Sequence, residues 1–302
     1  MPYQAFIPRL AEIGYRAIAI SVVPGYTIGG EWIANAASLD ALSADDRRRI
    51  KQEFVERDLA LPSVIGNQSL LLDEGERNDD ALARLRAAID LCTELCLPDQ
   101  PMPTLNTGTA GRPGEFESRT AQVVERLGGL TEYARKRGVV ICIEPHVGGA
   151  IDTIERAEAV VAAIDSPHLR LDFDVSHFEV QAVPMSESVP RLAPLAAAAE
   201  IKDQLARPTN AGYTGWIAGN GSGEATAPDG EPLTFQFLLG GEGDFDLPGY
   251  LKRIVQCGFS EPISFEASVQ CQARPGYDGL AEAEKTYRWM RAGWQAAGIS
   301  EN

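Results

Sequence analysis

The sequence predicts an α/β fold built on a parallel sheet. Short β-branched or apolar segments alternate with longer amphipathic segments along the chain, which is the pattern of strands joined by crossover helices. A closed (β/α)8 barrel and an open doubly wound sheet both have this pattern, and 302 residues suit either as a single domain, here 1–302. No G-x-G-x-x-G segment follows the early strands, so the usual sign of a dinucleotide-binding sheet is missing.

Seven segments are predicted as strands, and seven as helices. The strands are expected at Arg16–Val22, Leu61–Ile65, Pro103–Asn106, Val139–Glu144, Leu169–Asp174, Ala198–Lys202 and Pro262–Glu266. The helices are expected at Gln4–Gly14, Ser43–Leu59, Asn78–Cys96, Arg119–Arg137, Thr153–Ile164, Leu247–Cys257 and Leu280–Ala297. Because a complete barrel has eight strands, a barrel here either lacks or modifies its first strand, or closes through a partner.

One long segment, 204–243, has no periodic pattern and is rich in Gly, Thr, Asn and Pro. It follows Ala198–Lys202. This is the sixth predicted strand, and it would be strand 7 of an eight-stranded barrel that lacks its first strand. A loop of this length in a compact domain is usually functional, and in a barrel it would be an insertion over the C-terminal face, where active sites form. Within it, Tyr213–Ala218 and Leu233–Leu238 are predicted to pair as a hairpin. Its aromatic residues would form a small core of the segment or line a substrate pocket; they are Tyr213, Trp216 and Phe237.

The composition excludes several classes of partner. The net charge of −16 argues against nucleic acid and anionic membranes, since phosphate binding needs clustered Lys and Arg. No apolar run approaches the roughly 20 residues that span a bilayer. The first residues lack the basic and apolar parts of a signal peptide, so we expect a cytoplasmic location. Cys92 and Cys96 share a helix face with no second Cys pair or nearby His, which indicates reduced thiols rather than a zinc site.

Carboxylates stand at the ends of four predicted strands. These residues are Glu144, Asp174, Glu200 and Glu266. The carboxyl ends of parallel strands meet at one edge, so we expect the four side chains to converge. Converging carboxylates repel one another unless a cation offsets their charge. An all-oxygen ligand set favours Mn²⁺ or Mg²⁺ over zinc, so the sequence predicts one divalent metal site here.

Each of these carboxylates also has a simpler interpretation. A carboxylate at a strand end can cap a helix or accept hydrogen bonds from a loop. Asp172 faces the same side of its strand as Asp174, which is preferred because it lies nearer the carboxyl end. Glu200 could pair with Lys202 instead of binding metal.

Two of the three histidines lie beside these carboxylates. His146 follows Glu144 by two residues, and His177 follows Asp174 by three, so both are expected at the same barrel mouth. His146 is a candidate base because the pKa of an unperturbed imidazole lies near neutrality. His168 precedes a strand at the opposite end and is predicted to be structural.

The chain resembles the xylose-isomerase-like TIM-barrel superfamily, which includes sugar phosphate isomerases and epimerases. The resemblance rests on segments along most of the chain: Ala11–Val22, Gly138–His146, Leu171–His177, Ile201–Asp203, Gly240–Phe245 and Gly258–Glu266. It implies a (β/α)8 barrel holding one divalent metal, Mn²⁺ first, with Mg²⁺ or Co²⁺ as alternatives. It also implies that Glu144 and Glu266 flank the substrate, and that His177 and Lys202 bind it. Residue 200 departs from the pattern, since it is Glu where the family usually has His.

A narrower resemblance is to the large subunit of the C-glycoside deglycosidases, which split 3-oxo-glucosides of plant phenolics and pair with a smaller subunit. It rests on Glu-Pro-His at 144–146, the long segment 204–243 and the tail Val269–Asp278. Both resemblances imply removal of a proton next to a sugar carbonyl through an enediolate, with Glu144, His146 and Glu266 catalytic.

The outcome of that chemistry is open at this point. Proton transfer by the pair Glu144 and Glu266, in which the second carboxylate returns the proton at the other face or carbon, gives an isomerase or epimerase. Expulsion of an aglycone with His146 as base gives a carbon–carbon or carbon–oxygen lyase. The expected partners are a small sugar or sugar conjugate and either a smaller subunit or a second copy of the chain. A non-catalytic barrel scaffold is the alternative. A nuclease is disfavoured by the three histidines and the acidic charge.

Overall fold

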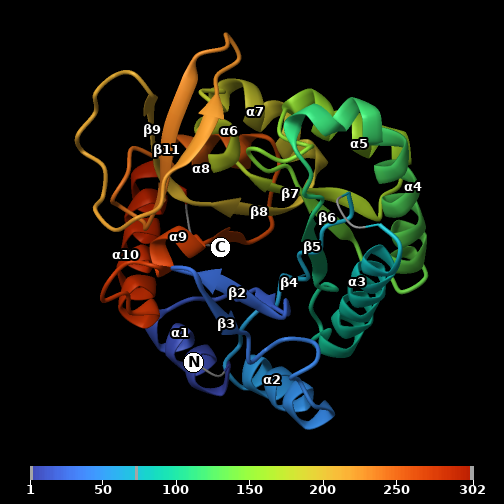
Figure 1. Cartoon of the computed structure of the whole chain (residues 1–302). Helices are drawn as coiled ribbons and strands as arrows, with labels where there is room; N and C mark the ends of the chain where they lie inside the picture. Colours follow the sequence, from blue (N-terminus) through green and yellow to red (C-terminus); the bar gives the residue numbers. More distant parts are fainter. Residues whose placement is uncertain (1–2, 72–73, 300–302) are drawn as a thin grey trace.

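A computed structural model describes residues 3–71 and 74–299. Its central feature is a parallel sheet whose spatial order follows the chain order, β1-β4-β5-β6-β7-β8-β12, and which curls into a barrel (Figure 1). The strands are β1 (Ile20–Ser21), β4 (Ser63–Ile65), β5 (Thr104–Gly108), β6 (Ile141–Glu144), β7 (Leu169–Asp174), β8 (Ala196–Ile201) and β12 (Ile263–Phe265). Each overlaps one of the seven segments that the sequence predicts as strands, with β5 ending two residues later and β8 beginning two residues earlier than predicted, and the parallel order confirms the fold class.

Eight helices form a ring around this sheet (Figure 1). They are α1 (Tyr3–Ile13), α2 (Ala44–Glu56), α3 (Glu76–Leu95), α4 (Phe116–Arg135), α5 (Ile154–Ile164), α7 (Met185–Leu192), α8 (Leu247–Gln256) and α10 (Gly279–Ala297). Each contacts the next, and α10 contacts α1, so the ring is closed. Seven of them were predicted. The exception, α7, is only eight residues long and contains Pro190. Shorter helices are α6 (Ser176–Glu179) and α9 (Val269–Gln272). Among the described residues, no helix is long and apolar enough to cross a membrane.

The barrel has one seam, between its edge strands β1 and β12. In the described part of the chain, no strand ladder joins them. The seam is bridged outside the sheet, where α1 packs on α10. The Tyr15 ring lies 5.1 Å from the ring of Tyr287, and the Tyr15 hydroxyl donates a hydrogen bond of 2.9 Å to the carbonyl of Ala283. Helix packing therefore completes the barrel where the sequence left its closure open.

The two faces of the sheet differ in character. Alternate strand residues point toward the helices and form the core; examples are Val64, Leu105, Ile141, Leu171 and Phe173. The residues facing the barrel interior are small or polar instead, and they include Ser63, Thr104, Asn106, Cys142, Asp172 and Ser264. Most (β/α)8 barrels fill this interior with branched aliphatic side chains. The interior of this barrel is lined by small and polar side chains instead, so it can accommodate polar groups.

The segment 204–243 contains a three-stranded antiparallel sheet. Its strands are β9 (Asp203–Pro208), β10 (Gly223–Thr226) and β11 (Pro232–Leu238), with β11 in the middle. The prediction of a strand at Leu233–Leu238 is confirmed, but the proposed partner Tyr213–Ala218 is wrong, because those residues are irregular. Leu233–Leu238 instead pairs with β10 on one side and with β9 on the other. Only Lys202 separates β8 from β9, so a single extended segment leaves the barrel and pairs with β11.

A small hairpin after β1 was not predicted. It consists of β2 (Gly25–Ile28) and β3 (Glu31–Ala34). Gly29 and Gly30 form its two-residue turn with φ of 58° and 87°, which suits a turn that needs positive φ at both positions. The side chains of β3 are exposed, so the hairpin lacks the alternating apolar pattern by which strands are recognised.

Candidate active site

The four predicted carboxylates meet at the carboxyl ends of the strands. Glu144 ends β6, Asp174 ends β7, Glu200 lies in β8 and Glu266 follows β12. Each offers an oxygen atom that lies within 4.8 Å of the oxygen atoms of the other three. Strand pairing sets this geometry, since Asp174 is directly opposite Glu200, which is directly opposite Ser264 on β12. The structure therefore brings together side chains from four distant parts of the sequence.

This carboxylate cluster is buried and under electrostatic strain. Glu200 is 5 % exposed and Asp174 is fully buried. Burial, together with the charges of Asp172, Glu266 and Glu144, raises the pKa of Glu200 well above its usual value. Burial and the charges of Glu144 and Asp174 do the same to the pKa of Asp172. The negative charge in the cluster thus exceeds what neighbouring cations offset.

Lys202 is the cation nearest to these carboxylates. Its ammonium donates to Asp174 Oδ2, lies 2.8 Å from Glu266 Oε2 and lies 3.7 Å from Glu144 Oε1. Burial opposes its charge, but the three carboxylates outweigh burial and raise the pKa of Lys202 well above its usual value. The alternative pairing of Lys202 with Glu200 is not what the structure has, since its ion pairs go to those three residues.

His177 is buried against Glu144. Its Nε2 lies 2.9 Å from Glu144 Oε1, so the ring donates to the carboxylate. Burial opposes ionisation of Glu144, but this hydrogen bond and the charge of Lys202 hold the pKa of Glu144 below its usual value. Burial, then the charges of His146 and Lys202, lower the pKa of His177 to about 4. The ring is therefore neutral at physiological pH and keeps Glu144 ionised.

His146 has a different environment. It is exposed, and its ring centroid lies 3.9 Å from that of His177. Its Nδ1 lies 2.7 Å from the carbonyl oxygen of Val147, which can only accept a hydrogen bond. The proton of the neutral ring is therefore on Nδ1, and Nε2 carries the basic lone pair. An imidazole held in this tautomer beside the carboxylates is equipped to take a proton from a bound molecule.

A family comparison identifies this barrel. The family profile described as xylose isomerase-like TIM barrel matches residues 7–293. The chain belongs to that family. Comparison with curated protein sequences finds no match.

Solved structures of this xylose isomerase-like fold are similar over most of their length. A xylose isomerase-like TIM barrel protein from Mycobacterium smegmatis, in complex with magnesium, has a TM-score of 0.62 and 18 % identity, covering 98 % of this chain and 90 % of that one. D-psicose 3-epimerase from Clostridium cellulolyticum H10, with D-tagatose, has a TM-score of 0.69 and 12 % identity, covering 98 % and 94 %. The 3-keto-D-glucoside 4-epimerase from E. coli has a TM-score of 0.60 and 14 % identity, covering 82 % and 85 %.

The donor set of this xylose isomerase-like barrel fits a divalent metal ion. The four carboxylates provide oxygen ligands only, and hard cations such as Mg²⁺ and Mn²⁺ prefer oxygen. His177, Glu144 and Asp174 form a second, overlapping group within the same 4.8 Å limit. One oxygen of Asp172 is buried with no hydrogen-bond partner, in keeping with unbalanced negative charge.

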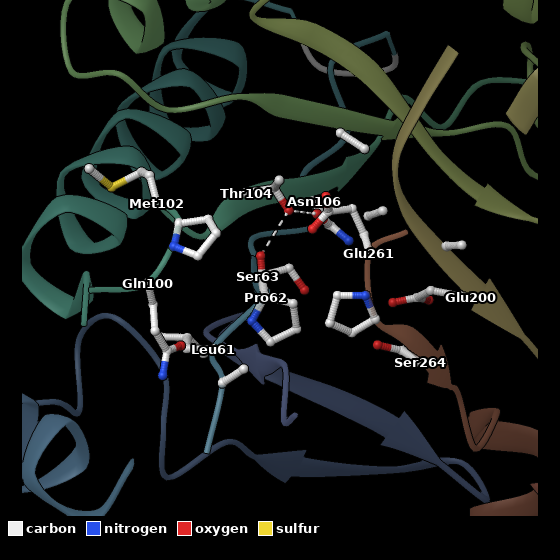
Figure 2. A pocket seen from close by; sticks show the side chains of 16 residues that line it. Leu61, Pro62, Ser63, Gln100, Met102, Thr104, Asn106, Glu200, Glu261 and Ser264 are labelled. Carbon is white, nitrogen blue, oxygen red and sulfur yellow. Dashed lines mark hydrogen bonds between the residues drawn. The ribbon is translucent and has the colours of Figure 1, made fainter. Parts of the chain in front are cut away.

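Asn106 is a site-adjacent residue that sequence inspection missed. Its amide donates a hydrogen bond of 2.7 Å to Asp172 Oδ2, and its oxygen accepts one of 2.7 Å from Thr104. Beneath them, a cavity of about 90 Å³ opens at the N-terminal ends of β4, β5, β8 and β12 and reaches Glu200 (Figure 2). Its presence follows from the small and polar side chains that line the barrel interior. The only sequence signal was their alternation along each strand.

Asp203, also missed, organises the Gly-Glu-Gly segment. Its carboxylate accepts hydrogen bonds from the backbone N–H groups of Gly241, Gly243, Phe245 and Gln204. A Cβ on Gly243 would lie 2.3 Å from Asp203 Oδ1, so only glycine fits there. The role of this Asp is to fix a loop rather than to meet substrate.

The remaining predicted residues divide between the site and its surroundings. Phe237 packs edge-on against the His177 ring at 5.2 Å, which brings the segment 204–243 to the site. It also joins a small apolar cluster with Phe235 and Val180. Tyr213 and Trp216 pack edge to face against each other, 5.0 Å between centroids. His168 bonds the carbonyl of Val139 through Nδ1 at 2.8 Å, as expected of a structural residue.

Proposed function

We propose that this protein is a divalent-metal-dependent enzyme that moves a proton next to the carbonyl group of a sugar or sugar conjugate. The observation that carries the proposal is the convergence of four carboxylates beside a histidine with a free Nε2 lone pair. The fold is shared with two sugar epimerases, D-psicose 3-epimerase and 3-keto-D-glucoside 4-epimerase, which supports a sugar as substrate. The magnesium complex of the M. smegmatis relative supports a divalent ion.

Glu144, Asp174, Glu200 and Glu266 would hold the ion. When bound, the ion supplies Lewis-acid polarisation of the sugar carbonyl, which acidifies the neighbouring C–H bond. Mn²⁺ is our first choice, with Mg²⁺ and Co²⁺ as alternatives. Glu200 in place of the family's usual His makes the set entirely oxygen and disfavours zinc.

The protein residues divide the proton transfer between them. Glu144 has a lowered pKa and a fixed hydrogen bond, so it suits a ligand better than a base. Glu266 has a side chain that is 45 % exposed and can reach a bound sugar. His146 can remove the proton through Nε2 to give an enediolate, and the resulting imidazolium can return that proton at the neighbouring carbon. Alternatively, Glu266 in its carboxylic acid form can deliver a different proton to the other face, and exchange with solvent then restores both groups. Lys202 would donate a hydrogen bond to a substrate oxygen, whereas His177 directs its Nε2–H at Glu144 Oε1 and would orient that carboxylate toward the substrate and the ion.

Isomerisation or epimerisation is the outcome we favour. Elimination of an aglycone from a 3-keto-glucoside, as in C-glycoside deglycosidases, shares the first proton transfer. The exposure of His146 at the mouth is compatible with this second outcome, because a large conjugate needs an accessible base. A smaller partner subunit is a proposal tied to that alternative alone.

The experiment combines metal analysis with isotope exchange. We expect about one equivalent of divalent ion per chain after loading, and activity that EDTA removes and Mn²⁺ restores. The metal-loaded protein is incubated in D₂O with D-fructose, D-psicose and a 3-keto-glucoside. Deuterium in recovered free sugar supports the isomerase or epimerase, and release of aglycone supports the lyase. If the protein binds no divalent ion and no substrate exchanges a proton or loses an aglycone, the proposed activity is wrong. The non-catalytic scaffold is then the remaining alternative.

A further inference from the structure

Lys202 lies among the same carboxylates that would hold a metal. Its Nζ contacts Asp174 Oδ2, Glu266 Oε2 at 2.8 Å and Glu144 Oε1 at 3.7 Å. All three residues belong to the four-carboxylate group whose oxygens lie within 4.8 Å of one another. A sphere of this size has room for one cationic centre with its ligands, since ligand oxygens stand about 2–2.6 Å from Mg²⁺, Mn²⁺ or Ca²⁺.

The strand geometry directs the Lys202 side chain into the barrel. Glu200 and Lys202 are two residues apart at the end of β8, so both point into the barrel. Lys202 is 2 % exposed, and burial of an ammonium is costly unless carboxylates offset it. The ammonium also lies 3.2 Å from Nε2 of His177, and the Phe237 ring, 5.3 Å from Nζ, adds a favourable aromatic face.

The charges do not balance with this lysine alone. Five carboxylates face the same space, those of Glu144, Asp172, Asp174, Glu200 and Glu266. Even the three that contact Lys202, those of Glu144, Asp174 and Glu266, carry more negative charge than one ammonium offsets, so a second cation is attracted. Because the attraction varies with the charge of the cation, a divalent ion interacts more strongly than the ammonium with the same oxygens.

We infer that Lys202 is a built-in competitor of the metal, an internal cation that holds the carboxylates together and is displaced from them when a divalent ion binds. The inference rests on the metal site of the proposed function. It assigns Lys202 two effects of opposite sign: the ammonium stabilises the protein without metal, and it weakens metal binding. A lysine that only contacts substrate would have neither effect.

The test removes the charge and measures metal affinity directly. Lys202→Met keeps most of the side-chain length, and Lys202→Gln also keeps a hydrogen-bond donor for Asp174. Lys252→Met, at an exposed position of α8, is the matched control. Mn²⁺ binding is followed by titration calorimetry, and thermal unfolding is recorded in EDTA and in Mn²⁺. If Lys202→Met fails to fold in EDTA, it is purified with Mn²⁺ and Lys202→Gln carries the comparison.

Both Lys202 variants are expected to bind Mn²⁺ about tenfold more tightly or better, as loss of a unit charge at contact distance requires. Their unfolding temperature in EDTA should fall below that of the wild type, and Mn²⁺ should raise it by more. The control should match the wild type in both measurements. Equal or weaker Mn²⁺ binding by Lys202→Gln, with normal binding by the wild type, would overturn the competition and leave the proposed function standing. If neither protein binds Mn²⁺, Mg²⁺ or Co²⁺, the proposed function fails and the inference with it.

Discussion

Oε1 of Glu144 accepts a hydrogen bond from Nε2 of His177 at 2.9 Å. The ring of His177 in turn lies against the ring of His146, 3.9 Å away between centroids. The buried ring of this pair is neutral and fixes a carboxylate, whereas the exposed ring carries a basic nitrogen. Two histidines in contact thus have different tasks, and each can be tested separately.

His146→Gln should lower kcat by about a hundredfold, because the proposed proton acceptor is lost. Metal affinity should be unchanged, since His146 does not belong to the carboxylate cluster. Steady-state kinetics and Mn²⁺ titration measure the two effects. His168→Gln at the opposite end of the barrel is the control and should keep full turnover. Equal loss of turnover in both variants would show that histidine replacement acts through the fold.

Glu266→Gln should lower turnover by about a hundredfold to ten-thousandfold, with an unfolding temperature close to that of the wild type. Its side chain is 45 % exposed, and Lys202 keeps Asp174 and Glu144 as partners when Glu266 loses its charge, so the fold depends little on it. Glu261→Gln, on the exposed segment before β12, is the matched control and should remain active. Substrate turnover near the wild-type rate in Glu266→Gln would remove Glu266 from the site.

Asp174→Asn and Asp172→Asn form a matched pair on one strand. Asp174 is in the carboxylate group, so its replacement should weaken Mn²⁺ binding by about a hundredfold or more. Asp172 is bonded to Asn106 and has its pKa raised by burial and by Glu144, so its replacement should change Mn²⁺ binding little and increase stability at neutral pH. Calorimetry and thermal unfolding provide the readouts. The opposite ranking of affinities would make Asp172 the ligand.

Glu179→Gln should change how stability depends on pH. Burial, then the charges of Asp246 and Asp203, raise the pKa of Glu179 from 4.5 to about 7, although Gln204 donates a hydrogen bond to it. The folded protein therefore holds a proton that the unfolded chain releases, and the associated stability is present below 4.5 and lost as pH rises through 7. The variant should be more stable than the wild type at about pH 8 and equal to it near pH 4.

Thermal unfolding across this pH range checks the expectation for Glu179. Glu187→Gln on α7, where the side chain is 54 % exposed, is the control and should follow the wild-type curve. A constant difference between Glu179→Gln and the wild type at all pH values would mean that the carboxyl group does not titrate differently on folding.

The sequence was sufficient for the barrel strands and the carboxylates at their ends. A strand such as Leu169–Asp174 combines alternating apolar residues with a polar end, and the parallel order of strands then brings those ends together. The same reasoning could not assign the ion-pair partner of each charged side chain. Glu200 and Lys202 seemed close because they are two residues apart, but side chains on one face of a strand run side by side. Lys202 instead pairs with Asp174 and Glu266, which lie at the ends of the two strands next to β8.

Contacts outside the strand pattern were not predictable. β9 pairs with β11 over more than twenty intervening residues, and no local turn signal marks the partner. The bond from His146 to Val147 and the four backbone bonds to Asp203 depend on loop conformation, which composition does not encode. The closure through Tyr15 and Tyr287 depends on residues far apart in the chain.

The seam between β1 and β12 gives the four carboxylates unequal freedom. β6, β7 and β8 are each paired on both sides, so the backbone beneath Glu144, Asp174 and Glu200 is locked by two ladders. Glu266 follows β12, which is paired on one side only. Three of the four carboxylates thus stand on backbone that is held from both sides, whereas the backbone of Glu266 is held from β8 alone, in part through its N–H bond to the carbonyl of Ile201. We therefore expect adjustment of the site to ions of different radius to come from the Glu266 side.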